Sequence, residues 1–249
     1  MTPWEMAAVL AAGVAGGGIN TVVGSGSLIT FPTLLAVGLP PITANVSNNI
    51  GLVPGGVTGA MGYRPELKGQ RERLLRLAPA SVIGSLAGGL LLLNLPESSF
   101  NVIVSVLIAL SCVMVLIQPR LSRMLAARPG QAHGGPWLWL GALAAGAYGG
   151  YFGAGQGILL IGIMGILLDE ELQRVNAAKN VLVLLVNFTA AILYTLVADV
   201  DWLAVLLVAL GSMIGGFLGA RVGRRLPAPI LRGVIVCIGV VAIVKLLAA

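Results

Sequence analysis

The chain has 249 residues, of which 57% are hydrophobic and only 10% are charged, and its formal net charge is +6. Soluble domains carry about 25% charged residues, so this composition excludes an ordinary soluble protein and indicates an integral membrane protein. The basic excess is typical of cytoplasmic loops, and attraction of anionic solutes is the alternative interpretation.

Four apolar segments are predicted in each half of the chain. The first has no basic region before its apolar run and is therefore interpreted as mature structure rather than a cleaved signal peptide. In chain order the segments cover 4–38, 42–63, 74–94 and 99–118, then a polar linker at 119–135, then 136–168, 176–198, 202–220 and 229–248.

The second half of the chain repeats the first. The matches occur in the same order on matching segments: VGSGS (23–27) with FGAGQ (152–156), Asn45 to Asn49 with Asn176 to Asn180, Thr58 and Tyr63 with Thr189 and Tyr194, IGSLAGG (83–89) with LGSMIGG (210–216), and LP at 95–96 with LP at 226–227. We therefore expect a duplication, with a first repeat at 1–118, a cytoplasmic linker at 119–135 and a second repeat at 136–249.

Loop charges predict that the repeats have opposite orientations. The loop after 42–63 is basic, whereas the corresponding loop after 176–198 carries Asp199 and Asp201 and no base. Basic loops stay in the cytoplasm, so the two loops should lie on opposite sides and both termini should be extracytoplasmic. Each long broken segment, 4–38 and 136–168, must then cross an even number of times, as a re-entrant hairpin or as two short spans.

The predicted fold is thus an all-α integral membrane protein of two inverted-topology repeats, each a broken or re-entrant helix pair plus three transmembrane helices. Non-helical backbone at membrane depth is tolerated only inside protein or beside a water-filled cavity. The helix after each break starts at the break, and helix N-termini attract anions. We expect the breaks to form a midplane binding site that includes Gly24, Ser25, Gly26, Ser27, Gly153, Gly155 and Gln156. For isolated patterns such as Gly84-x-x-x-Gly88, close helix packing is the preferred interpretation.

Polar side chains within the apolar segments extend this candidate site. Asn45 and Asn49, like Asn176 and Asn180, are spaced to share one helix face and should point into the bundle. Lys179 aligns with Asn48; as an intramembrane cation it is a candidate site residue, and snorkelling to the cytoplasmic surface is the alternative.

The two repeats also place a threonine and a tyrosine at matching positions. Thr58 and Thr189 are candidate hydroxyl donors, with bonding to their own helix carbonyls as the alternative. Tyr63 and Tyr194 fall near segment ends and are predicted to be interfacial anchors.

Every Asp and Glu falls at a terminus or in a loop, which favours an anionic over a cationic substrate. His133 lies in a loop, and Cys112 and Cys237 lie inside apolar segments, so we expect no enzyme activity, no cofactor and no metal site. The expected partners are a small anionic substrate and the lipid bilayer, with no nucleic acid; a homo-oligomer is compatible with the sequence.

At the two Gly-rich breaks the sequence resembles the TauE/SafE family of sulfite exporters. VGSGSLITFP (23–32) is similar to the first family signature and YFGAGQGILLIGI (151–163) to the second. The first departs from the family by having Ser25 and Ser27 where Gly is more usual, and the second lacks a Pro after the break. The resemblance implies transport of sulfite or a small organosulfur anion such as a sulfonate, often outward, across the bacterial inner membrane. A passive anion channel or facilitator, and a transporter of a different small anion, are the alternatives; an intramembrane enzyme or a scaffold is not favoured.

Overall fold

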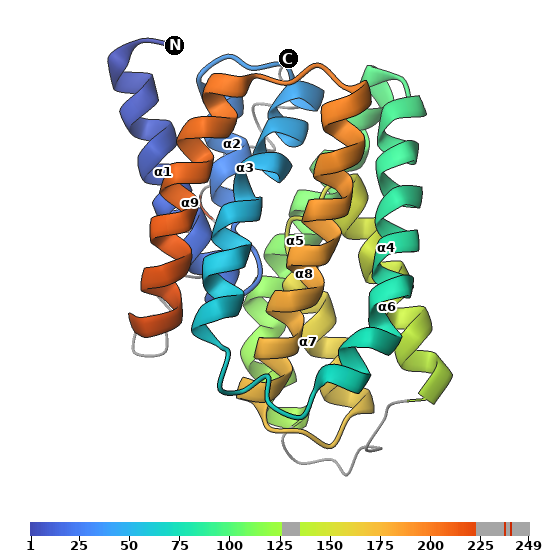
Figure 1. Cartoon of the computed structure of the whole chain (residues 1–249). Coiled ribbons are helices and arrows are strands. Elements are labelled where there is room, and N and C mark those ends of the chain that lie inside the picture. The colour runs from blue at the N-terminus through green and yellow to red at the C-terminus, as the bar shows by residue number, and fades with distance from the viewer. Residues whose placement is uncertain (126–134, 223–236, 238–239, 241–249) are drawn as a thin grey trace.

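The computed structural model describes residues 1–125, 135–222, 237 and 240, and within them the fold is all-α, with no strand (Figure 1). The helices are α1 (Pro3–Val22), α2 (Ser27–Ala36), α3 (Pro41–Gly62), α4 (Arg71–Asn94), α5 (Glu97–Leu125), α6 (Gly135–Tyr151), α7 (Gln156–Leu167), α8 (Leu172–Val197) and α9 (Trp202–Val222). The predicted segment 229–248 lies outside the described residues except at two positions.

The broken segments are found where the sequence predicts them. Segment 4–38 is α1 followed by α2, and segment 136–168 is α6 followed by α7. Several helices extend beyond their apolar runs: α8 starts at Leu172, and α5 continues to Leu125, into the predicted linker. Apolarity marks only the part of a helix suited to the bilayer, so it underestimates helix length.

Four described helices are long and apolar enough to cross a membrane: α1, α4, α8 and residues 202–221 of α9. By contrast, α2 and α7 have 10 and 12 residues, and at about 1.5 Å per residue neither reaches across a core of about 30 Å. In Figure 1, α1 starts at the upper end and α2 leads back to it; α6 starts at the lower end and α7 leads back there.

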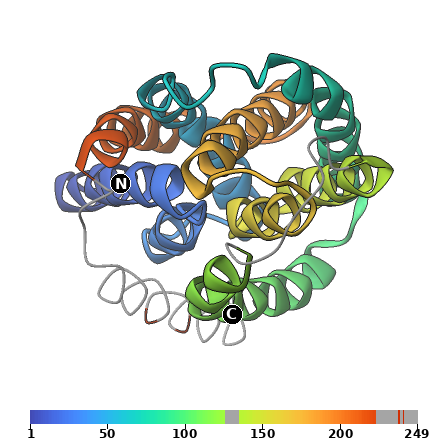
Figure 2. The ribbon, with the colours of Figure 1, turned by 90° about the horizontal axis from the view of Figure 1, so that it is seen from below.

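Two groups of closely packed helices make up the bundle. In one, α9 packs against α1 and α3; in the other, α4 packs against α6 and α8. Between the groups, α8 packs against α3 about as extensively as it packs against α4. Seen from below (Figure 2), α8 lies between α1 and α9 on one side and α4 and α6 on the other. A Cβ added at Gly84 or Gly88 would collide with backbone atoms of α6, which supports the close-packing interpretation of that pattern.

A serine hydroxyl interrupts the hydrogen-bond ladder of α3. Pro54 lies inside this helix. Next to it, Ser212 Oγ of α9 accepts from the Gly55 amide at 3.2 Å and donates to the Gly51 carbonyl at 2.8 Å. The hydroxyl thus stands between two backbone groups that would otherwise bond to each other, and it joins α3 to α9.

At the lower end, polar groups tie the loop before α4 to the start of α8. Arg174 donates to the Lys68 carbonyl at 3.1 Å, and Gln70 donates to the Arg174 carbonyl at 2.9 Å. Glu170 pairs with Arg73 at 3.0 Å and with Arg174 at 2.6 Å. Burial acts to raise the pKa of Glu170, but the hydrogen bonds and charges of the two arginines outweigh it, so the pKa lies below its usual value.

Candidate functional site

The helices before the two breaks end in the same way. Each ends next to a glycine with left-handed backbone, φ +86° at Gly24 and +79° at Gly153. In each case this glycine and the residue before it both donate to one carbonyl, that of Ile19 at 3.1 and 2.7 Å and that of Tyr148 at 3.1 and 3.0 Å. Glycine adopts this conformation at little cost, so it can end a helix where a side chain would be strained.

The two breaks lie in direct contact. The Gly157 amide, at the start of α7, donates to the Gly24 carbonyl of the first break at 3.0 Å. A Cβ added to either glycine would lie only 2.4 Å from the Cα of the other, so the backbones meet with no side chain between them. Beside this point, the rings of Phe31 and Phe152 pack edge to face with centroids 5.2 Å apart. We call this meeting point the crossing.

Polar groups at the crossing lack protein partners. Neither Gly26 nor Gly155, which precede α2 and α7, provides a side-chain cap. Ser25 Oγ and both polar atoms of the Gln156 side chain are buried, at 0% and 1% residue exposure, and have no hydrogen-bond partner among the described residues. In the same part of the chain, the amides of Ser25 and Gly26 donate to no recorded group. These unpaired groups include the donors that would suit an anion.

The four predicted asparagines are all buried. Asn45 Nδ2 donates to the Tyr151 carbonyl, at the end of α6, at 3.0 Å, while its Oδ1 has no partner in the described structure. Asn49 Nδ2 lies 3.5 Å from Asn187 Oδ1. Asn176 Oδ1 and Asn180 Nδ2 likewise have no described partner. These amides are therefore only partly satisfied by the protein.

Two further asparagines belong to this polar region, and neither is among the predicted site residues. Asn48 donates to Ser27 Oγ at 3.1 Å and accepts from the Thr30 hydroxyl, which fixes the first turn of α2. Asn187 contacts Asn49. The sequence spacing could have identified Asn187, because this residue follows Asn180 by two helical turns and therefore lies on the same helix face.

Lys179 is fully buried, so its predicted alternative, snorkelling to the surface, is wrong. Its ammonium donates to the carbonyls of Asn20 at 3.0 Å and Thr21 at 3.2 Å, in the last turn of α1. A Cβ added at Gly157 would lie 2.8 Å from Lys179 Cδ, so the lysine stem runs past the crossing. The negative end of the α1 macrodipole thus stabilises the ammonium of Lys179, as water would do at the membrane surface.

The threonine hydroxyls are occupied by helix carbonyls. Thr189 donates to the Leu185 carbonyl of its own helix at 2.8 Å. Thr58 donates to the carbonyls of Gly55 at 3.1 Å and of Met213, on α9, at 3.0 Å. These contacts favour a role in helix packing, and the structure brings neither hydroxyl to the crossing.

The tyrosines are not interfacial anchors. Tyr63 and Tyr194 are 1% and 0% exposed, and the Tyr194 hydroxyl donates to the Gly150 carbonyl, near the end of α6. A buried tyrosine needs a partner for its hydroxyl, and the last turn of a helix offers free carbonyls. The prediction used only the position of each tyrosine in its segment, which does not show which way the ring points.

The chemistry of the crossing is that of a donor-rich site. No Asp or Glu is among the buried side chains of the described residues. Within the same part of the chain, no group of three or more His, Cys, Asp or Glu is placed to hold a metal. Amides, hydroxyls and one ammonium can bind an anion without proton transfer or metal chemistry.

Comparisons with known proteins find relatives over nearly the whole chain. The model of the family "Sulfite exporter TauE/SafE" matches residues 9–246. The probable membrane transporter protein YfcA of Escherichia coli K12 is 26% identical over 236 residues, which cover 93% of this chain and 85% of the relative. Probable membrane transporter proteins of Haemophilus influenzae (24% identical; 86% of this chain, 84% of the relative) and Sinorhizobium sp. (23%; 93% and 88%) are also similar. No solved structure matches the chain.

Proposed function

The chain belongs to the TauE/SafE family of sulfite exporters and is a membrane transporter, and on this premise we propose that it moves a small anion by secondary transport. The proposed substrate is sulfite or an organosulfur anion such as a sulfonate, and the proposed direction is outward across the bacterial inner membrane. The family name supports the sulfur anion, and the donor-rich crossing supports a negative charge.

The observation that carries the proposal is the set of unpaired buried groups at the crossing. A buried polar group without a partner costs about 1–3 kcal/mol, so such groups in a native protein call for water or a ligand. Ser25 Oγ and the Gln156 side-chain amide have no partner among the described residues. These two residues are the chain neighbours of Gly24 and Gly157, whose backbones are in contact. An oxyanion would accept from these groups and from the backbone amides of Ser25 and Gly26, which precede α2.

The proposed binding residues are those of the breaks together with the buried amides and the lysine: Gly24, Ser25, Gly26, Ser27, Gly153, Gly155, Gln156, Asn45, Asn49, Asn176, Asn180 and Lys179. Thr58 and Thr189 are left out because their hydroxyls already donate to carbonyls. A helix C-terminus carries roughly half a negative charge, so the α1 end balances only part of the Lys179 charge. The remainder is available to an anion in surroundings from which water is largely excluded.

Inverted repeats at 1–118 and 136–249 are the architecture we propose for this site. The matching helix ends at Gly24 and Gly153 support it, as does the packing of α1 on α9 and of α6 on α4. In Figure 1 the basic loop 63–70 lies at the lower end, and the acidic loop 198–201 at the upper end. The lower end is therefore the proposed cytoplasmic side, with the N-terminus outside.

A pair of serine variants tests the site. Ser25 and Ser81 are both buried with an unpaired hydroxyl, but Ser81 lies on α4 against Gly146 of α6, in a helix interface. Removing an unpaired hydroxyl should leave the melting temperature of the ligand-free protein unchanged or slightly raised in both variants. Losing a hydrogen bond to a charged ligand should weaken sulfite binding by Ser25→Ala roughly 10- to 100-fold.

The measurement is the sulfite-dependent rise in melting temperature of detergent-purified protein, with a sulfonate, acetate and alkali cations at matched ionic strength. Ser81→Ala should keep the wild-type response. Equal sulfite responses in the two variants would remove the crossing as the site, and a response to cations alone would overturn the anionic substrate. Sulfite uptake into proteoliposomes preloaded with sulfite should be faster than into empty ones; without that stimulation, the passive facilitator would be the better description.

A further inference from the structure

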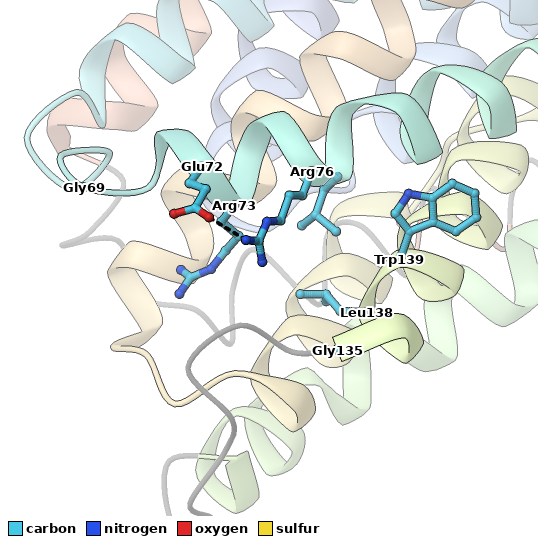
Figure 3. Close-up of a pocket in the computed structure, with 8 residues that line it drawn as sticks. Gly69, Glu72, Arg73, Arg76, Gly135, Leu138 and Trp139 are labelled. Atoms are coloured by element: carbon cyan, nitrogen blue, oxygen red, sulfur yellow. Dashed lines mark hydrogen bonds and ion pairs between the residues drawn. The ribbon is translucent and has the colours of Figure 1, made fainter.

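A cavity lies at the lower end of the molecule, and none of the residues proposed to bind the anion lines it. It has a volume of about 360 Å³ and lies between the first turns of α4 and α6 (Figure 3). Its lining includes Glu72, Arg73, Arg76 and Leu77 of α4, and Leu138 and Trp139 of α6. Nothing in the proposed transport site involves these side chains, so the cavity needs its own explanation.

The charged side of the cavity holds two arginines in different states. Arg73 is fixed in place, because it donates to Gln70 Oε1 at 2.8 Å and pairs with Glu170 at 3.0 Å. Among the described residues, Arg76 pairs only with Glu72, at 2.5 Å, and the two side chains are 58% and 71% exposed. An exposed pair of this kind contributes little to stability, so the Arg76 guanidinium can exchange Glu72 for a stronger partner. A guanidinium binds phosphate through two parallel hydrogen bonds, which suits that exchange.

The other side of the cavity is apolar and continues onto the outer surface of the bundle. Leu77 and Leu138 are buried at its floor, and Trp139 lies at its rim. Leu75 and Trp137 next to it are exposed, as expected for surface that faces lipid. Trp is enriched where a membrane protein meets the headgroup layer. The lining therefore has a charged part and an apolar part side by side. An amphipathic molecule could contact the first with its charged end and the second with its apolar end.

We propose that this cavity binds an anionic phospholipid, with the phosphodiester on Arg76 and the upper part of an acyl chain along Leu77, Leu138 and Trp139. Basic pockets between transmembrane helices on the cytoplasmic side are suited to lipid headgroups. Inorganic phosphate shares the headgroup chemistry but would leave the apolar wall unused, so the lipid is the better match. The proposal does not depend on which anion is transported.

The test compares lipids and phosphate on purified protein in a neutral detergent. Melting temperature is measured against increasing phosphatidylglycerol, phosphatidylcholine or inorganic phosphate, for the wild type, Arg76→Gln and Arg64→Gln. Arg64 is an exposed arginine of the same end that does not line the cavity, so its variant controls for lost surface charge. We expect phosphatidylglycerol to stabilise the wild type more than phosphatidylcholine does. Arg76→Gln should weaken phosphatidylglycerol binding about fivefold more than Arg64→Gln does.

Any of three other outcomes would contradict the proposal. Equal stabilisation by the two lipids would show that the headgroup charge is not recognised. Equal effects of the two arginine variants would show that the lipid is attracted by general surface charge and not by Arg76 in particular. Stabilisation by inorganic phosphate alone, lost in Arg76→Gln, would assign the cavity to a small phosphate and not to a lipid. Because Arg76 is exposed, unfolding of the variant is not expected to obscure the result.

Discussion

Replacing Gly157 by alanine tests whether the two breaks touch. A Cβ at this position would lie 2.4 Å from Gly24 Cα, 3.0 Å from the Gly24 carbonyl oxygen and 2.8 Å from Lys179 Cδ. The lysine could move, but the backbone of the first break could not without shifting the end of α1. Overpacking of this kind costs about 1–3 kcal/mol, and stretching the Gly157–Gly24 hydrogen bond costs about 1 kcal/mol more.

Alanine also has a favourable effect at this position, because it is the better helix former by at most about 1 kcal/mol. The net destabilisation is therefore about 1–3 kcal/mol, and the melting temperature should fall by roughly 2–12 °C for a chain of this size. Sulfite-dependent stabilisation should fall as well, since the donors on both sides of the contact would be moved apart.

Gly56→Ala is the matched control, in the middle of α3. There the atom nearest to a Cβ would be Leu184 Cδ1 at 3.1 Å, a terminal methyl group that can move away, and Cβ and Cα of Leu184 would lie at ordinary contact distances of 3.4 and 3.6 Å. The helix preference of alanine then dominates, and the melting temperature should stay the same or rise by a few degrees, given about 2–4 °C per kcal/mol. Melting curves of both purified variants decide the matter. If Gly157→Ala were as stable as Gly56→Ala, the breaks would not be in contact in the folded protein.

Two further predictions concern charged groups. Lys179→Met should abolish sulfite counterflow and lower stability by about 1–3 kcal/mol, because two carbonyls of α1 lose their donor; wild-type counterflow in this variant would contradict a role in binding. Arg73 and Arg174 hold the pKa of Glu170 below that of a free glutamate, so the stabilising effect of this carboxylate is present at neutral pH and is lost as the pH falls through the folded-state pKa. The melting temperature should therefore fall less between pH 6 and pH 3.5 in Glu170→Gln than in the wild type, and parallel curves would show that the ion pairs add nothing.

Local chemistry explains which features of the site could be predicted. Glycines inside long apolar runs marked both breaks, because a left-handed helix end requires them, and the asparagine spacing placed four amides on buried helix faces. The contact between the breaks was expected from their positions in the duplication. None of these inferences needed knowledge of how the helices pack.

The features that could not be predicted depend on tertiary partners. The partner of Lys179 is the end of α1, far away in the sequence, and composition cannot distinguish that partner from the membrane surface. Tyr194 has the sequence position of an interfacial anchor, yet its hydroxyl is used to satisfy a carbonyl of α6. The cavity between α4 and α6 was not predicted, and Arg76 was not singled out, because nothing in the sequence brings the start of α4 next to the start of α6.

The hydroxyl of Ser212, joined to α3 beside Pro54, limits how the molecule can move. Because α9 is bonded to α3 and packed along α1, these three helices resist separation, although two come from the first half of the chain and one from the second. The helices α4, α6 and α8 form the corresponding mixed set. If transport involves rocking, the moving bodies cannot be the two halves of the sequence. A body built on α1, α3 and α9 takes two helices from the first half of the chain and one from the second, and α8, which packs against both α3 and α4, joins this body to the other set.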